Sequence, residues 1–252
     1  RALYRSNESI KKVKKVFSYY SDKIETQFKK IEWVQGDLND IPKLEEAFKG
    51  ITKVFHCAAL ISFAPNDYNQ LKKINIEGTA NIVNLCISYS IQKLCYVSSV
   101  ATMGFDPIRI SEETTWKSEE VKNVYALTKY AAEKEVWRGI QEGVPCVIVN
   151  PGVILGPGYF NSGSGLIFKI IRKGLMYKTN GITGYVDVND VVKSMLLLMS
   201  DKHLNERYII VGKTLSFSEL TSKISKSLGV KAPEKIAKKW MYTIHDAWMG
   251  KA

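Results

Sequence analysis

The 252-residue sequence lacks the features that mark membrane proteins and metalloproteins. No apolar run reaches the ~18 residues that a membrane-spanning helix needs. The chain has three histidines and four cysteines, with neither a CxxC pair nor a Cys/His metal spacing among them. We therefore expect no transmembrane segment and no bound metal. The cysteines lie far apart in apolar stretches, which favours buried, reduced thiols and a cytoplasmic location; they are Cys57, Cys86, Cys95 and Cys146.

A secretory signal is also missing from the sequence. The chain opens with Arg-Ala-Leu-Tyr-Arg, without a Met or an apolar stretch, and we expect that residues precede Arg1. Positive charge, by contrast, is in excess, since the net charge is +11. The lysines are spread along predicted helix faces, and aromatic residues are not interleaved with them. We interpret them as a solvated surface that attracts anionic small molecules, and we expect no nucleic-acid partner.

The first 150 residues alternate between strand and helix patterns. We predict strands at 3–5, 31–35, 53–57, 93–98 and 144–149. Helices are predicted between them at about 10–20, 40–49, 69–88 and 124–141. Repetition of this strand–helix unit predicts an α/β fold, in which a doubly wound parallel sheet is covered by helices on both faces.

Beyond Pro151 the alternation loosens, and Gly and Pro cluster between Gly152 and Gly165. We predict a smaller lobe over 151–252, with a helix to about Lys173 and a helix capped by Asp190. Strands are predicted at 185–188 and 208–211, and Ser216 and Glu219 have the spacing of a capping box before a helix that ends at Gly229. The tail 240–248 is amphipathic, and core packing is our default for it.

The most specific chemical pattern is Tyr125-Ala-Leu-Thr-Lys129. Residues four apart share one face of a helix, so the lysine should lower the pKa of the tyrosine and suit it to proton transfer near neutral pH. Alone this pair is weak, because helices contain it by chance. However, a buried strand is predicted to end in Ser98-Ser99, and the carboxyl ends of such strands form the binding crevice. A serine there can hydrogen-bond a substrate oxygen as charge develops on it.

Together these motifs resemble the extended branch of the short-chain dehydrogenase/reductase superfamily. The order is Ser98-Ser99, then Tyr125-x-x-x-Lys129, then a strand ending in Asn150-Pro151-Gly152. Further segments agree with the family pattern along essentially the whole chain: Gly36-Asp37-Leu38, Val54 to Ala59, Asn75-Ile-Glu-Gly-Thr79, Gly156-Pro157-Gly158 and Gly184 to Asp190. The resemblance implies a Rossmann-like dinucleotide-binding domain over 1–150 and a mainly substrate-binding lobe over 151–252, interleaved with the first.

The resemblance also implies roles for particular residues. Tyr125 would be the general acid/base, Lys129 would hold the nicotinamide ribose, and Ser99 would polarise the substrate oxygen. Asn75 would position either its helix or a water, and a purely structural role is equally open. The remaining implied cofactor contacts are Arg5, Asp37, Leu38, Cys57, Ala58, Ala59, Ser98, Pro151, Gly152 and Val153. The implied substrate contacts are Phe63, Met103, Asn150 and Phe160.

One family element has no counterpart in the sequence. The Gly-x-x-Gly-x-x-Gly turn that holds the pyrophosphate follows the family's first strand, and nothing like it stands before Leu3. We expect it upstream of Arg1, and a chain that truly began there would bind cofactor poorly. The first predicted strand here ends at Arg5 without an acidic residue. An arginine at this point pairs with a 2′-phosphate, which favours NADP over NAD.

Several reactions occur on this fold. Dehydratases carry an Asp-Glu pair after the strand-end residue, whereas Val100-Ala101 follows Ser99 here, which disfavours dehydration. The chain is more similar to dihydroflavonol reductases and 3β-hydroxysteroid dehydrogenases, which implies reduction of a ketone or aldehyde on a fairly apolar small molecule. A nucleotide-sugar epimerase and a non-catalytic NADP(H)-sensing protein stay as alternatives. The resemblance also suggests a homodimer formed through the two long helices.

Overall fold

The computed structural model describes residues 1–106, 108–117, 123–200 and 202–237. The centre of the fold is a four-stranded parallel sheet in the order β3-β4-β5-β9, which confirms the predicted α/β class. A separate parallel pair, β1 and β2, lies beside it, and β1 makes no ladder with β3. The strands are β1 (Ala2–Tyr4), β2 (Trp33–Gln35), β3 (Lys53–His56), β4 (Lys93–Val97), β5 (Cys146–Pro151) and β9 (Glu206–Ile210).

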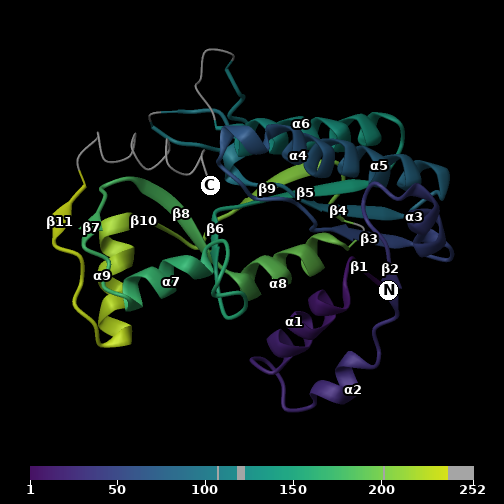
Figure 1. Cartoon of the computed structure of the whole chain (residues 1–252). Helices are drawn as coiled ribbons and strands as arrows, with labels where there is room; N and C mark the ends of the chain where they lie inside the picture. Colours follow the sequence, from purple (N-terminus) through teal and green to yellow (C-terminus); the bar gives the residue numbers. More distant parts are fainter. Residues whose placement is uncertain (107, 118–122, 201, 238–252) are drawn as a thin grey trace.

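Helices cover both faces of the sheet (Figure 1). Above it lie α3 (Ile41–Phe48), α4 (Tyr68–Leu71), α5 (Gly78–Ser88) and α6 (Val124–Gln141), and below it α8 (Val188–Leu198). Helices α1 (Asn7–Phe17) and α2 (Ile24–Phe28) follow β1. Strand side chains alternate between the faces: Leu94 and Tyr96 enter the core under α5 and α6, whereas Cys95 packs toward α8. Burial on both faces explains why the two central strands, β4 and β5, are almost wholly apolar.

The helix predicted over 69–88 is interrupted. A π-helical segment, η2 (Lys72–Glu77), connects α4 to α5. The buried Asn75 lies in this segment, where its amide accepts a hydrogen bond from Leu60 N at 2.7 Å and donates one to Leu60 O at 3.0 Å. Such π segments occur often at functional sites. Here the segment anchors the loop that follows β3, which leads along the chain into a short 3-10 turn, η1 (Pro65–Asp67).

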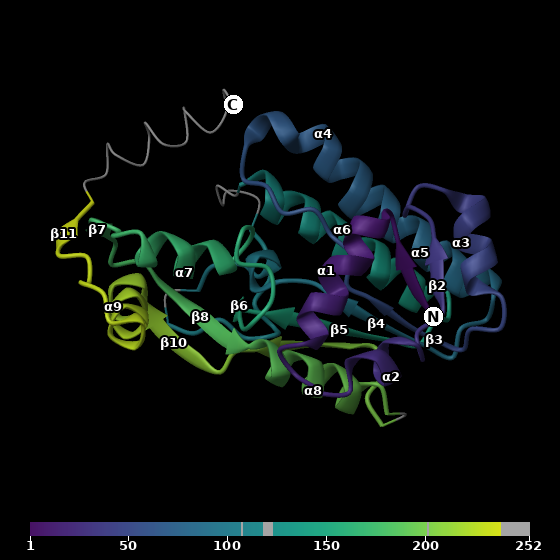
Figure 2. The same cartoon turned by 60° about the horizontal axis from the view of Figure 1, so that its bottom comes forward.

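A smaller lobe begins where β5 ends (Figure 2). Its sheet has the order β10-β8-β6, and α7 and α9 pack against it around Tyr185, Leu220 and Ile224. The predicted capping box joins Ser216 to Glu219, and Gly229 ends the helix in a left-handed conformation. The elements are β6 (Val153–Leu155), α7 (Gly165–Arg172), β7 (Tyr177–Lys178), β8 (Ile182–Asp187), β10 (Lys213–Ser216), α9 (Phe217–Leu228) and β11 (Lys235–Ile236).

Two expectations about this lobe change. Helix α8 is capped by Asp187, whose carboxylate accepts from Asn189 N at 2.7 Å, whereas Asp190 lies in the first turn. Asp187 has the extended backbone that an N-cap residue needs, which Asp190 does not. The predicted strand at 208–211 pairs with β5 and therefore belongs to the main sheet. The amphipathic tail 240–248 lies outside the described residues.

Candidate active site

Tyr125 lies in the first turn of α6, beside the carboxyl end of β4. The Asn123 side chain accepts a hydrogen bond from Ala126 N at 2.8 Å and so caps this helix. The side chain of Ser99, which follows β4, lies beside the Tyr125 hydroxyl and acts to lower its pKa. The Phe63 ring packs edge-on against Tyr125, with 5.6 Å between ring centroids. The structure thus brings the predicted tyrosine and serine together at the edge where the parallel strands end.

The electrostatics of Tyr125 differ from the sequence expectation. Burial raises the pKa of Tyr125, and the side chain of Ser99 opposes this only in part. Lys129, which was expected to lower that pKa, directs its ammonium elsewhere: it donates to Tyr96 Oη at 2.7 Å and to Val97 O at 2.9 Å. The lysine stem passes through the interior, so Nζ reaches the end of β4 rather than the phenol.

Lys129 is itself strongly perturbed. Its side chain is 2% exposed, and burial lowers its pKa to about 7, although the nearby Glu133 and Cys57 act in the opposite direction. The two bonds to β4 use two of the three ammonium hydrogens. Among the described residues, one hydrogen is left for a further acceptor such as a ribose hydroxyl.

The two strand-end serines have different roles. Ser98 is buried and donates to Glu133 Oε2 at 2.5 Å, so its hydroxyl does not face the crevice. Ser99 is half-buried and contacts Tyr125. Side chains alternate along the strand end, which separates the two. Ser98, predicted among the cofactor contacts, is therefore placed in the interior, and Ser99 is the serine of the candidate site.

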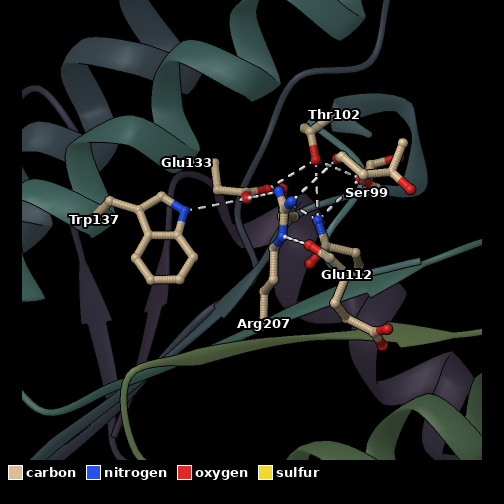
Figure 3. A network of polar contacts seen from close by, with 9 residues as sticks. Ser99, Thr102, Glu112, Glu133, Trp137 and Arg207 are labelled. Atoms are coloured by element: carbon tan, nitrogen blue, oxygen red, sulfur yellow. Dashed lines mark hydrogen bonds and ion pairs between the residues drawn. The ribbon is translucent and has the colours of Figure 1, made fainter. Parts of the chain in front are cut away.

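Glu133 is the centre of a polar network that the sequence analysis did not single out (Figure 3). Its carboxylate is 2% exposed. It lies eight residues after Tyr125 on α6, a spacing that would have suggested the same helix face. One partner, Trp137, lies four residues along the same helix. The others come from positions far apart in the chain, which is why no local pattern indicated them: Ser98, Thr102, Asn150 and Arg207.

A cavity of about 530 Å³ lies beside β1 and β3. Six of the predicted cofactor residues line it together, namely Arg5, Asp37, Leu38, Cys57, Ala58 and Ala59. The small side chains after β3 leave the backbone accessible, the Asp37 carboxylate caps the turn by accepting from Asn39 N at 3.0 Å, and Arg5 is exposed. This wall fits the adenosine part of a dinucleotide. No Gly-x-x-Gly-x-x-Gly turn that would hold a pyrophosphate occurs among the described residues.

The loop after β3 links this cavity to Tyr125. It runs from Cys57, in the cavity wall, to Phe63, which packs on Tyr125. Cys57 itself differs from expectation: three of the cysteines are buried, but Cys57 is exposed because it opens into the cavity. All four are free thiols, and desolvation by the surrounding protein raises the pKa of Cys57.

The other predicted residues divide into buried and exposed sets. Met103 and Asn150 are 1% and 0% exposed, so neither touches a substrate without rearrangement; Asn150 donates to Glu133, and Met103 directly follows the turn Val100–Thr102. Phe63 and Phe160 are 57% and 42% exposed and stay candidates for substrate contact. Pro151 and Gly152 are buried at the end of β5, and Val153 is half-buried. A Cβ on Gly152 would collide with the carbonyl of Gly184, which explains the glycine.

A larger cavity lies elsewhere. It has a volume of about 820 Å³ and is lined by Trp116, Tyr130 and Trp137 among others, but by neither Tyr125 nor Ser99. We therefore do not place the reaction there. In the part of the chain that the structure describes, no group of His, Cys, Asp and Glu side chains suits a metal ion. Within those same residues, no helix is both long enough and apolar enough to cross a membrane.

A parallel sheet buried on both faces, with a Ser–Tyr–Lys set at its carboxyl edge, defines an α/β protein of the Rossmann type. Residues 4–212 match the model of the NAD dependent epimerase/dehydratase family, and the chain belongs to this family. A nicotinamide cofactor is therefore the one to consider for the cavity.

Among curated proteins, a putative dihydroflavonol 4-reductase of Synechocystis sp. is 31% identical over 87% of this chain and 66% of its own length. Cinnamoyl-CoA reductase 1 of Petunia hybrida is 28% identical over 76% of this chain and 60% of its own length. The chain thus spans 60 to 66% of the length of these two relatives.

Solved structures agree on the fold. The crystal structure of gox2253 is 28% identical, with a TM-score of 0.81, and the match covers 97% of this chain and 72% of that one. The UDP-glucose 4-epimerase of Thermus thermophilus, solved as a complex with NAD, is 26% identical with a TM-score of 0.69, over 83% of this chain and 72% of that one.

Proposed function

We propose that the protein is an NADP(H)-dependent oxidoreductase that reduces a ketone or aldehyde group on a fairly apolar small molecule. The observation that carries this proposal is that Ser99 and Tyr125 lie together at the carboxyl edge of the sheet, with Lys129 one turn further along α6. The named reductase relatives support a reductase, since they match most of this chain.

In the proposed reaction, Tyr125 donates its phenolic proton to the substrate oxygen. Because burial raises its pKa, the phenol is protonated at neutral pH, which is the form that a proton donor needs. The Ser99 hydroxyl donates a hydrogen bond to the same oxygen as negative charge develops on it. NADPH, when bound, supplies the hydride that is added to the carbonyl carbon. Lys129 positions the cofactor through the ammonium hydrogen that β4 does not use.

The preference for NADP rests on Arg5. This residue follows β1, lines the cavity and is exposed, so its guanidinium is available to a 2′-phosphate. The epimerase of T. thermophilus was solved with NAD, which makes NAD the alternative to test.

The preference for an apolar substrate rests on exposed apolar side chains of two loops, one of which contributes Phe63, the ring that packs on Tyr125. Ile61 and Phe63 are both 57% exposed on the loop after β3, and Tyr159 and Phe160 are 49% and 42% exposed on the loop after β6. Large exposed apolar groups that gather beside a polar site favour binding of an apolar molecule.

We also propose a cellular location and an oligomeric state. The free cysteines, three of them buried, support a reducing, cytoplasmic location. Helices α5 and α6 form an outer layer that would serve as the interface of a homodimer, which sedimentation analysis can test.

The direct test is NADPH oxidation by the full-length protein with a panel of apolar ketones and aldehydes. We expect turnover with at least one compound, and loss of more than roughly 1,000-fold in kcat for Tyr125→Phe with little change in NADPH affinity. Conversion of UDP-glucose without net NADPH oxidation would favour an epimerase instead. NADPH binding without any turnover would favour a non-catalytic sensor.

A further inference from the structure

The carboxylate of Glu133 joins five separate parts of the fold (Figure 3). Its Oε2 accepts from Ser98 Oγ at 2.5 Å, from Thr102 Oγ1 at 2.8 Å and from Asn150 Nδ2 at 2.9 Å. Its Oε1 accepts from Trp137 Nε1 and from Arg207 Nη1, each at 3.3 Å. The donors come from the end of β4, the turn η3 (Val100–Thr102), α6 itself, β5 and β9. One buried side chain thus holds together the elements that meet beneath the candidate site, at the carboxyl edge of the main sheet.

These contacts reach both halves of the candidate site. Tyr125, Lys129 and Glu133 follow one another at intervals of four residues, so they share one face of α6. On the other side, Ser98 precedes Ser99 directly, and Asn150 Nδ2 also donates to Ser99 O at 3.2 Å. The Glu133 carboxylate therefore connects the helix that carries the proton donor to the segment that carries the serine.

The network continues into the loop 111–116. Arg207 donates from Nε to Glu112 O at 2.8 Å and from Nη2 to Thr114 O at 3.2 Å, while it pairs with Glu133 through Nη1. Glu112 Oε1 in turn accepts from Ile209 N at 2.8 Å. The loop before α6 is thereby fixed against β9. Glu133 is buried and Arg207 is partly buried, so the pair is costly to break because the carboxylate alone would be left uncompensated.

We propose that Glu133 is a positioning residue, which sets the spacing between Ser99 and the Tyr125–Lys129 pair. The proposal rests on the proposed function, since it concerns the reacting groups of that same site. A displacement of about 1 Å between such groups lowers a rate by roughly 100-fold. Five hydrogen bonds to one rigid carboxylate are the kind of support that prevents it.

The charge of Glu133 adds a second effect, which belongs to the same proposal. The titratable groups around the Lys129 ammonium are Tyr96 from β4, His56 and Cys57 from β3 and the loop after it, and Glu133 from its own helix. Of the two that raise the pKa of Lys129, Glu133 acts more strongly than Cys57. Removal of its charge should therefore lower the pKa of Lys129, so that the ammonium form is lost at a lower pH.

The test is Glu133→Gln, which keeps the shape of the side chain and removes its charge. We expect kcat to fall by roughly 10- to 100-fold, the KM for NADPH to change little, and the alkaline limb of the kcat profile to move to lower pH. Glu135→Gln is the matched control: it makes the same change two residues along α6, where Glu135 pairs with Arg138 at the surface. It should leave the rate and the profile unchanged.

A purely structural role would lower kcat without moving the pH profile, and that result would overturn the proposal, as would an unchanged kcat. Titration of Lys129 by NMR of isotope-labelled lysine reports the same shift without any turnover. If the wild type reduces no carbonyl compound, the proposed function fails, but this titration still tests Glu133. Should Glu133→Gln not fold, Ser98→Ala replaces it: a lower kcat supports the proposal and a wild-type kcat contradicts it.

Discussion

At the scale of single residues, a line of buried polar side chains lies beneath the candidate site. This polar column consists of Thr79, His56, Tyr96 and Lys129. Nε2 of His56 lies 2.9 Å from Thr79 Oγ1, and the His56 ring packs against Tyr96, which accepts from Lys129. Burial, with the nearby Lys129, lowers the pKa of His56 to about 3 from an ordinary 6.5. His56 is therefore neutral in the folded protein, whereas in the unfolded protein it can take up a proton.

This column predicts a loss of stability in acid. Below pH 6.5 His56 is protonated in the unfolded chain but not in the folded chain. The free energy of unfolding therefore falls as the pH drops toward 3. Between pH 6.5 and 4.5 the contribution is roughly 2 to 3 kcal/mol. Denaturant titrations should show a shallower pH dependence for His56→Gln than for the wild type. Equal slopes would contradict the buried, neutral histidine.

Arg5 carries the second residue-scale prediction. Arg5→Ser would remove the charge-assisted hydrogen bond that we propose for the 2′-phosphate, so the KM for NADPH should rise by roughly 10- to 100-fold while that for NADH changes little. Lys11→Ser serves as the control, since it removes the same charge from α1 outside the cavity. An equal effect of Arg5→Ser on both cofactors would show that Arg5 does not contact a 2′-phosphate.

At the scale of elements, the first turn of α6 decides where Tyr125 lies. Asn123→Ala removes the cap of this helix and should cost about 1 kcal/mol of stability. Because Tyr125 is only two residues away, fraying should lower kcat by more than the loss of folded protein explains. Asn123→Asp keeps the cap and should restore both values. Kinetics and thermal unfolding of the two variants decide the matter; a full rate in Asn123→Ala would contradict this account.

The sequence predicted elements and local pairs better than it predicted long-range contacts. Ser99 and Tyr125 were expected together because a strand end and a helix start each have local signals, and the structure joins them. The π segment was missed because it depends on the bond between Asn75 and Leu60, a contact outside its helix. The prediction that Lys129 lowers the pKa of Tyr125 was wrong for the same reason, since the ammonium instead contacts Tyr96, which belongs to another element. Met103 and Asn150 were assigned by their place in the chain, and tertiary packing buries both.

At the scale of the whole molecule, the two parallel sheets differ in how deeply their strands are buried. Every residue of β5 is buried, and β4 lies between two cores, whereas β1 and β2 are half-exposed and pair only with each other. Hydrogen exchange should therefore be slowest in β4 and β5, with protection at least roughly tenfold lower in β1 and β2. Equal protection throughout would show that both sheets open as one unit.

Deuterium labelling tests most directly whether Tyr125 and Ser99 serve a net hydride transfer to a carbonyl. The full-length protein is given NADPH deuterated at the transferred position of the nicotinamide, and the product is analysed by mass spectrometry. We expect one deuterium in the alcohol product of the wild type, and the same label formed more than roughly 1,000-fold more slowly by Tyr125→Phe. Product without the label, or label at the wild-type rate in Tyr125→Phe, would contradict this role.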